Sequence, residues 1–310
     1  MRSPRDLYEL NDQVSEHLRA RSQEHRVGPV LVVALKGFID AGNVGAITVE
    51  HLLGLATARR FTTFDHDSLI DYRAKRPVMT FDTNRWTSYA EPEIAIELLQ
   101  DNEGTEFLLM HGAEPDRSWN AFVAAVTELI REYNVSLVVS AYGIPMGIPH
   151  TRPLSITMHA TNEALLGDEK AWMGKVQVPG SAVNLLEFRL ADSHIDAVGV
   201  AVHVPHYLAQ SQYPPAAMSA LTRVEGLTGL DFNVLGLGKQ AEDALEEVTK
   251  QIEQSSDAQE MVTGLENQYD AFMAAHASDS LLATDEHMPT ADELGAEFER
   301  FLAQRHDDDK

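Results

Sequence analysis

Polar residues stand directly after several apolar runs of this sequence, at places where a strand would end. The runs PVLVVALKGFID, FLLMHG, SLVVSAYG and DAVGVAVHV each contain or are soon followed by histidine, aspartate, asparagine or arginine. Histidine changes charge near neutral pH and aspartate accepts protons, so these residue types suit proton transfer or ligand binding. The sequence predicts six ligand-binding candidates: Asp40, Asn43, His111, Arg152, His203 and His206.

Asp40 and Asn43 allow two interpretations. They precede a helical pattern, so they either cap its free N–H groups or contact a ligand. The segment DAGNVG lacks both the GxGxxG pattern and the lysine of a phosphate-binding loop. An aspartate about 4 Å from a phosphate charge would also repel it by about 4 kcal/mol at an effective dielectric constant of about 20. The sequence therefore does not favour a phosphate site, although Arg73, Lys75 and Arg76 supply cations.

The histidines of HVPH allow three interpretations: hydrogen bonds to backbone at a strand end, proton transfer or ligand binding, and metal coordination. The Val-Pro pair between them gives a bent, non-helical spacing, and no third ligand is fixed, so we predict no metal site. Ser140 and Ser181 lack the G-x-S-x-G turn that exposes a nucleophile. We predict no cofactor and assign no catalytic residue.

The elements that must position these residues alternate between strand and helix. Strands are predicted at 29–40, 61–67, 107–112, 136–143, 154–160 and 196–204, and helices at 41–60, 119–133 and 181–191. Such βαβ units pair their strands in parallel, and we expect the first two strands to pair in this way. Ligands gather outside the carboxyl ends of parallel strands, so the candidates are expected on one shared rim of an α/β domain.

Three further segments complete the predicted organisation. Residues 1–25 are expected to hold an N-terminal helix, amphipathic over Ser3–Arg19, and residues 26–232 the α/β core. Within that core, RPVMTFD and EPEIAIELL read as antiparallel edge strands of a hairpin layer inserted at 71–101. Residues 233–310 are predicted as an acidic α-helical extension with a disordered tail, helical from Gln240 with interruptions near 276–279 and 288–289.

The net charge of the chain excludes some classes of binding partner. The formal net charge is −24, and residues 239–310 contain 19 acidic against 5 basic side chains. Binding to nucleic acid or to an anionic membrane depends on a basic surface, so we predict neither partner. The acidic end of the chain is either a solvated helical surface or a docking arm for a basic partner.

Cysteine content and hydropathy exclude further classes of protein. The sequence has no cysteine, which excludes disulfides, thiolate catalysis and cysteine-ligated metals. Its longest apolar run, VLVVAL, is far shorter than the roughly 18 residues that a membrane span needs. The start MRSPRDLYELND has no apolar core of an export signal. We therefore predict a cytoplasmic protein.

Four segments together resemble a known family. GFIDAGNVG, HGAEPDRSW, SAYGIP and VHVPHYLAQSQYPPAA are similar, in order and spacing, to the proteasome assembly chaperone 2 family in its longer bacterial, actinobacterial-type branch. The likeness runs from about Val30 to about Leu230. It implies a three-layer α/β/α fold with a mostly parallel central sheet, phosphorylase/hydrolase-like, plus a C-terminal α-helical extension. It also implies homo-oligomers, for which we predict a trimer.

Two functions of different class follow. The resemblance implies a non-enzymatic role in assembly or protein interaction, since eukaryotic and archaeal relatives chaperone proteasome subunits. Those relatives dock through a hydrophobic–tyrosine–any-residue tail, and the end RHDDDK has no penultimate tyrosine, so that route is not expected here. The alternative is a nucleoside- or phosphate-type binding protein, or a hydrolase- or phosphorylase-like enzyme, whose site lies at the strand ends. Convergence of the six candidates on one cavity would favour the alternative.

Overall fold

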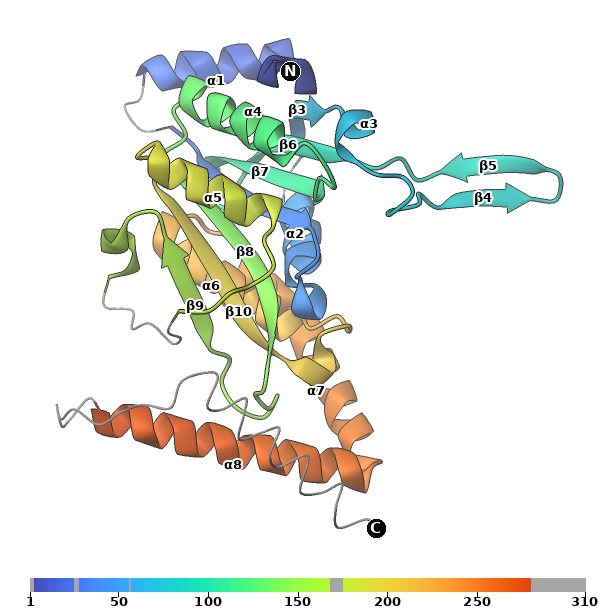
Figure 1. The fold of residues 1–310 in the computed structure, drawn as a ribbon, viewed down its shortest axis with the longest axis vertical. Helices are drawn as coiled ribbons and strands as arrows, with labels where there is room; N and C mark the ends of the chain where they lie inside the picture. Colours follow the sequence, from blue (N-terminus) through green and yellow to red (C-terminus); the bar gives the residue numbers. More distant parts are fainter. Residues whose placement is uncertain (1–2, 25–27, 56, 168–174, 280–310) are drawn as a thin grey trace.

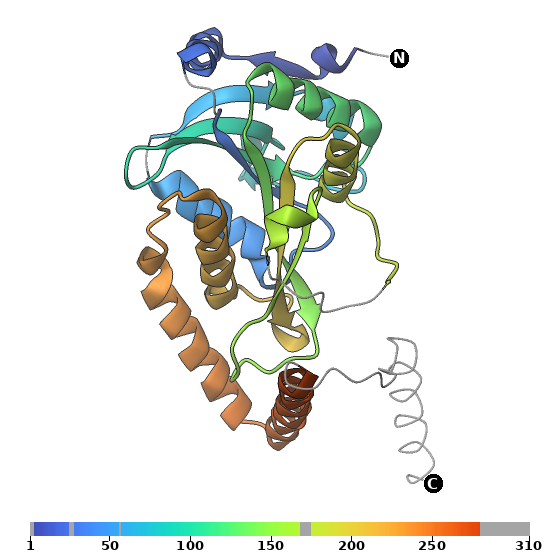
Figure 2. The ribbon, with the colours of Figure 1, turned by 90° about the vertical axis from the view of Figure 1, so that its left-hand side faces the viewer.

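A central sheet with helices on both faces forms the core of the protein (Figures 1 and 2). The computed structural model describes residues 3–24, 28–55, 57–167 and 175–279. In these residues the sheet has eight strands in the order β1-β3-β6-β7-β2-β8-β10-β9. The strands are β1 (Tyr8–Leu10), β2 (Val30–Lys36), β3 (Arg59–Phe64), β6 (Ile94–Gln100), β7 (Glu106–Ala113), β8 (Leu137–Met146), β9 (Ile156–Ala160) and β10 (Ala197–Pro205).

The middle of the sheet is parallel and its outer parts are antiparallel. Strands β7, β2, β8 and β10 pair in parallel. Strands β1, β6 and β9 run against their neighbours, so β3 points the same way as the four central strands. The predicted α/β fold with a mostly parallel central sheet is confirmed. The predicted parallel pairing of the first two long strands is wrong, because β6 and β7 lie between β2 and β3 and the sheet order is not the chain order.

Each face of the sheet has its own layer of helices and its own apolar core. One core joins the sheet to α1 (Asp12–Glu24), α4 (Trp119–Glu132) and α5 (Ala182–Asp192). The other joins it to α2 (Val44–Leu55), α6 (Pro214–Thr228) and α7 (Gly238–Glu253). Burial on both faces explains why the central strands are almost continuously apolar; all nine residues of β10 are buried.

Short helices connect these elements, and one long helix follows them. The short ones are η1 (Pro4–Leu7), η2 (Ala41–Asn43), α3 (His66–Leu69), η3 (Glu163–Leu166), η4 (His206–Leu208) and η5 (Val234–Leu237). Helix α8 (Ser256–Asp279) crosses below the carboxyl ends of β8 and β10 (Figure 1). No described helix is long and apolar enough to cross a membrane.

The segment 71–101 differs from its prediction. The hairpin consists of β4 (Met79–Asp82) and β5 (Arg85–Tyr89), which form a separate two-stranded sheet that projects from the body (Figure 1). The second predicted edge strand, EPEIAIELL, contains β6, which lies inside the main sheet between β3 and β7. The short segment and its proline are typical of an edge strand, but the neighbouring strands β3 and β7 pair with β6 on both sides.

Both ends of the described chain also correct their predictions. The helix expected over Ser3–Arg19 begins only at Asp12, because β1 precedes it and pairs antiparallel with β3. Helix α6 is absent from the predicted elements. The C-terminal helical region breaks between α7 and α8, not near 276–279, since α8 continues to Asp279. The interruption near 288–289 and the predicted disordered tail lie outside the described residues, and the predicted domain boundaries stay predictions.

Candidate functional site

Asp40 lies at the start of α2, where it accepts backbone hydrogen bonds. Its Oδ1 accepts from the N–H of Gly45 at 2.8 Å and of Gly143 at 3.4 Å, and its Oδ2 from Ala46 at 3.3 Å. Burial raises the pKa of this carboxyl, while these N–H bonds lower it in part. A Cβ on Gly143 would lie 2.0 Å from the carbonyl oxygen of Ala41, so glycine lets β8 approach this closely. Asp40 thus joins the ends of β2 and β8.

Asn43 fixes the same turn to the segment after β10. Its Nδ2 donates to the carbonyl oxygen of Ser211 at 3.1 Å. Its φ of 54° lies in the left-handed region, which asparagine adopts more readily than most residues. Both residues therefore make the capping and turn contacts of one of their two interpretations, and ligand contact stays a prediction.

His203 is buried on β10, and His206 is exposed just beyond it. His203 is only 2% exposed. Its ring Nε2 lies 2.7 Å from Oγ1 of Thr157, and its backbone N–H donates to the carbonyl oxygen of Ser155. Burial lowers the pKa of His203 to about 4, so the ring is neutral at pH 7. His206 instead packs edge-on against the ring of Tyr207 at 5.5 Å. The two histidines have different surroundings.

His111 lies apart from these residues, on β7. Its Nε2 is 3.8 Å from Oε1 of Glu97 on the neighbouring strand β6, which is too long for a hydrogen bond. Glu97 is also paired with Arg60 at 2.6 Å. The pair is buried within the sheet, and two strands, β2 and β8, lie between β7 and the strand β10 that carries His203.

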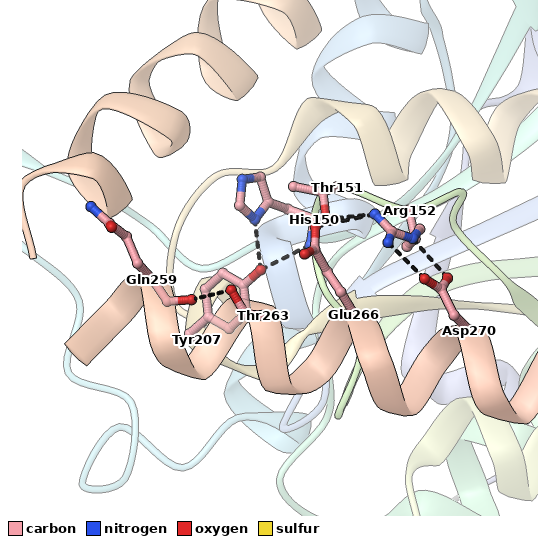
Figure 3. A network of polar contacts seen from close by, with 8 residues as sticks. All are labelled: His150, Thr151, Arg152, Tyr207, Gln259, Thr263, Glu266 and Asp270. Carbon is pink, nitrogen blue, oxygen red and sulfur yellow. Dashed lines mark hydrogen bonds and ion pairs between the residues drawn. The ribbon is translucent and has the colours of Figure 1, made fainter. Parts of the chain in front are cut away.

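Arg152 binds the acidic face of α8 (Figure 3). Its guanidinium donates to both carboxylate oxygens of Asp270, at 2.8 and 2.7 Å, and to Oε1 of Glu266 at 3.1 Å. The bond to Arg152 lowers the pKa of the Asp270 carboxyl. Two acidic residues of the C-terminal region therefore form ion pairs within the same chain, which the sequence alone did not indicate.

The residues before Arg152 extend this contact. Oη of Tyr207 accepts from the N–H of His150 at 2.8 Å and lies 2.7 Å from its Nδ1. Burial lowers the pKa of His150, so Nδ1 of the neutral ring accepts the tyrosine proton. Thr151 bonds Glu266, and Tyr269 donates to the carbonyl oxygen of Pro153. We name the contact of His150, Thr151, Arg152, Tyr207, Glu266 and Asp270 the α8 clasp (Figure 3).

The candidates share the carboxyl side of the sheet, but their bonds lead in different directions. Asp40 and Asn43 hold one turn, Arg152 holds α8, and His111 faces β6. Sequence reasoning missed the role of Glu266 and Asp270 because their distance from Arg152 along the chain exceeds 110 residues. The excess of acidic residues in 239–310 was the available signal, but it did not identify Arg152 as their partner.

Comparisons with known proteins place this architecture among solved structures. A family model described as the PAC2 family matches residues 34–252. A Mycobacterium tuberculosis protein of unknown function is 39% identical with a TM-score of 0.82, over 89% of this chain and 92% of that chain. A Corynebacterium glutamicum protein of unknown function is 35% identical with a TM-score of 0.79, over 86% and 98%.

A third similar structure has a descriptive name. It is a proteasome-assembly chaperone homologue of Mycobacterium tuberculosis, 26% identical with a TM-score of 0.69, over 75% of this chain and 99% of that chain. Among the curated proteins compared, none matches this chain.

Proposed function

This chain belongs to the PAC2 family, and from that premise we propose that it is a homo-oligomeric protein with a non-enzymatic role in assembly or protein interaction. The family predicted from the sequence is confirmed. One relative is described as a proteasome-assembly chaperone homologue, which supports a role in binding other proteins. The different surroundings of the six candidate residues support the non-enzymatic part, because catalysis needs groups held around one reacting atom.

The hairpin β4–β5 is the observation that carries this proposal. All nine residues of its strands are exposed, including Phe81 at 56% and Trp86 at 62%. The two rings meet edge-on at 5.0 Å, and Val78 beside them is 72% exposed. A two-stranded hairpin is marginally stable alone in water, and apolar patches of this kind mark interaction surfaces. The hairpin therefore has the chemistry of a segment that becomes covered on association.

A second copy of this chain is the occupant that we propose for the hairpin. The chain carries a formal charge of −24, so two copies repel each other over most of their surface. Residues 78–90 contain one acidic and one basic side chain, Asp82 and Arg85, and are neutral. Contact through this neutral apolar hairpin minimises the repulsion. We propose a trimer, in a cytoplasmic protein, consistent with the cysteine-free sequence.

Light scattering at micromolar concentration tests this proposal. We expect three times the chain mass of 34.3 kDa for the native protein and the single-chain mass for the variant Phe81→Ser/Trp86→Ser. Each buried interface aromatic contributes about 2 kcal/mol or more, so the double variant should weaken association at least a hundredfold. The control Phe188→Ser removes a ring that is likewise 62% exposed, on α5, and should keep the native mass.

Two results would contradict the proposal. A mass of 34.3 kDa for the native protein at micromolar concentration would show a single chain and contradict oligomerisation. An unchanged mass for the double variant would place the interface outside the hairpin.

A further inference from the structure

Strand β9 forms one edge of the eight-stranded sheet, next to β10 (Figure 1). Within the described residues it pairs only with β10, antiparallel and over five consecutive residues without a bulge. All nine residues of β10 are buried, whereas all five residues of β9 are half-buried. In the part of the chain that the structure describes, the outer side of β9 therefore has no strand beside it.

The hydrogen bonds at both ends of β9 determine which of its main-chain groups face outward. The N–H of His203 donates to the carbonyl oxygen of Ser155, and the N–H of Thr161 donates to that of Ala197. Bonded positions alternate along an antiparallel pair, so residues 155, 157, 159 and 161 face β10. The residues whose N–H and C=O groups face outward are Ile156, Met158 and Ala160. These groups repeat about every 6.8 Å, which is the spacing that an added extended chain presents.

Strand β9 lacks the features that protect sheet edges from pairing, which are short length, proline, charged residues and bulges. The opposite edge strand, β1, has only three residues, and one of them is Glu9. Strand β9 has the sequence ITMHA, without proline, lysine, arginine, aspartate or glutamate. The ring of its His159 lies over Gly199 of β10 and bonds Glu187 on α5 at 2.7 Å. An unprotected edge of this kind is a template for another extended chain.

Acidic residues lie close in sequence to the paired ends of β9 and β10. Glu163 follows β9 and is exposed, and Asp196 directly precedes β10 at the end where Ala160 pairs with Val198. The whole chain carries a formal charge of −24. A segment with basic residues at its ends is therefore attracted to this edge, and an acidic segment is repelled.

We propose that β9 binds an extended segment of a partner protein, which adds a strand to the sheet and carries lysine or arginine at its ends. Main-chain hydrogen bonds to the outward groups of β9 provide the contact. The middle of the segment is uncharged and rich in β-branched residues, which favour strands. This inference rests on the proposed role in protein interaction and names the chemistry of the partner, but its contact is β9 and not the hairpin.

Titration of the full chain with three labelled peptides, followed by fluorescence anisotropy, tests the inference. The peptides are KVTVTVK, KVTPPVK and EVTVTVE, each acetylated and amidated. KVTPPVK keeps the charge but loses one main-chain donor of each alternating set, and EVTVTVE keeps the centre but reverses the charge. We expect KVTVTVK to bind about tenfold more tightly than either. No binding of KVTVTVK, or equal binding of one of the other two, would overturn the inference.

Amide hydrogen exchange, measured by NMR on the native chain, locates the contact. With KVTVTVK bound, the amides of Ile156, Met158 and Ala160 should exchange about tenfold more slowly, because each gains an acceptor. The amides of Thr157 and His159 already face β10 and should not change. Protection outside β9, without this alternation, would overturn the inference.

A pair of variants at Met158 separates main-chain from side-chain contact. Met158→Pro removes an outward N–H and keeps the bonds to β10, since proline is tolerated at sheet edges where its nitrogen faces outward. It should weaken KVTVTVK binding about tenfold, with thermal unfolding measured alongside. Met158→Ala keeps the N–H and is the matched control, with binding expected within about twofold of the native protein. Equal loss in both variants would contradict main-chain recognition.

Light scattering on the same samples distinguishes this inference from the hairpin proposal. Met158→Pro should lose peptide binding and keep the mass of the native protein. Loss of both would make β9 a contact between copies of this chain and overturn the inference. A native protein of trimeric mass that binds no peptide would also overturn it, while the hairpin proposal would stand.

Discussion

The hairpin β4–β5 and the helix α8 both extend beyond the α/β core, and they differ in how much of their surface is exposed. The hairpin exposes every residue of its two strands. Helix α8 places Glu266 and Asp270 on Arg152 and buries Val262 to 6% exposure. The difference separates two kinds of appendage: one is held by polar contacts within its own chain, and the other exposes apolar rings, which we propose are covered by a second copy.

The largest expected effect is a pH response on the α8 side of the molecule. Burial lowers the folded-state pKa of His203 from 6.5 to about 4, so the unfolded chain binds this proton first. The resulting stability is complete above about pH 6.5 and is lost as the pH falls toward 4. Because 1 pKa unit corresponds to about 1.4 kcal/mol, the loss at pH 4 is about 3 kcal/mol.

Denaturant unfolding of the native protein and of His203→Gln at pH 7 and pH 4 measures this loss. The difference in free energy of unfolding between the two should change by about 3 kcal/mol over that range, in the direction that disfavours the native protein at pH 4. His206→Gln is the matched control, since His206 is exposed and is the first residue after β10; this variant should follow the native protein. A constant difference for His203→Gln would contradict the burial argument. The hairpin 78–90 contains no histidine, so this pH response is expected on the α8 side of the molecule and not from the hairpin.

A smaller, local effect is expected from Arg152→Ala. The variant removes the bidentate partner of Asp270 and leaves Glu266 beside it, so two carboxylates repel each other on α8. Amide hydrogen exchange in α8 should accelerate, while the mass measured by light scattering stays that of the native protein. Arg189→Ala is the control, because Arg189 pairs with Asp192 within α5. Unchanged exchange in α8 would show that apolar packing alone holds this helix.

The smallest expected effect is that of salt, and it should differ between the two appendages. Raising the ionic strength from 0.1 to 1 M shortens the Debye length from about 10 Å to about 3 Å, which screens the half-exposed ion pairs of the clasp. Exchange in α8 should therefore rise slightly, while association through the apolar hairpin should persist in light scattering. Dissociation of the oligomer by salt would break the comparison, because it would assign ionic contacts to the hairpin interface.

Most of the core was predictable from sequence, because long apolar runs are typical of strands covered on both faces. The runs that became β2, β7, β8 and β10 are all present and parallel. The order of strands was less predictable: β6 looked like an edge strand, yet its partners β3 and β7 bury it. Residue type reports burial, whereas neighbours in a sheet depend on the path of the whole chain.

The surroundings of the candidate residues were only partly predictable from the sequence, and ligand binding by them stays a prediction. Asp40 was correctly placed before a helix, since capping residues precede helices in sequence. Arg152 was singled out, but its partners lie more than 110 residues later. His159 and Glu187 gave no sequence signal, because the passage of an imidazole over Gly199 depends on two strands being adjacent.

The sequence by itself determined the α/β class, the family and the excess of negative charge, because these follow from residue types and their order. Tertiary structure alone decided which side chains meet: it brought α8 onto Arg152, Glu187 onto His159, and left Phe81 and Trp86 in solvent. The physical reason is the distance along the chain over which each effect acts. Periodicity and capping act over a few residues, whereas contacts between distant segments form only when the whole chain has packed.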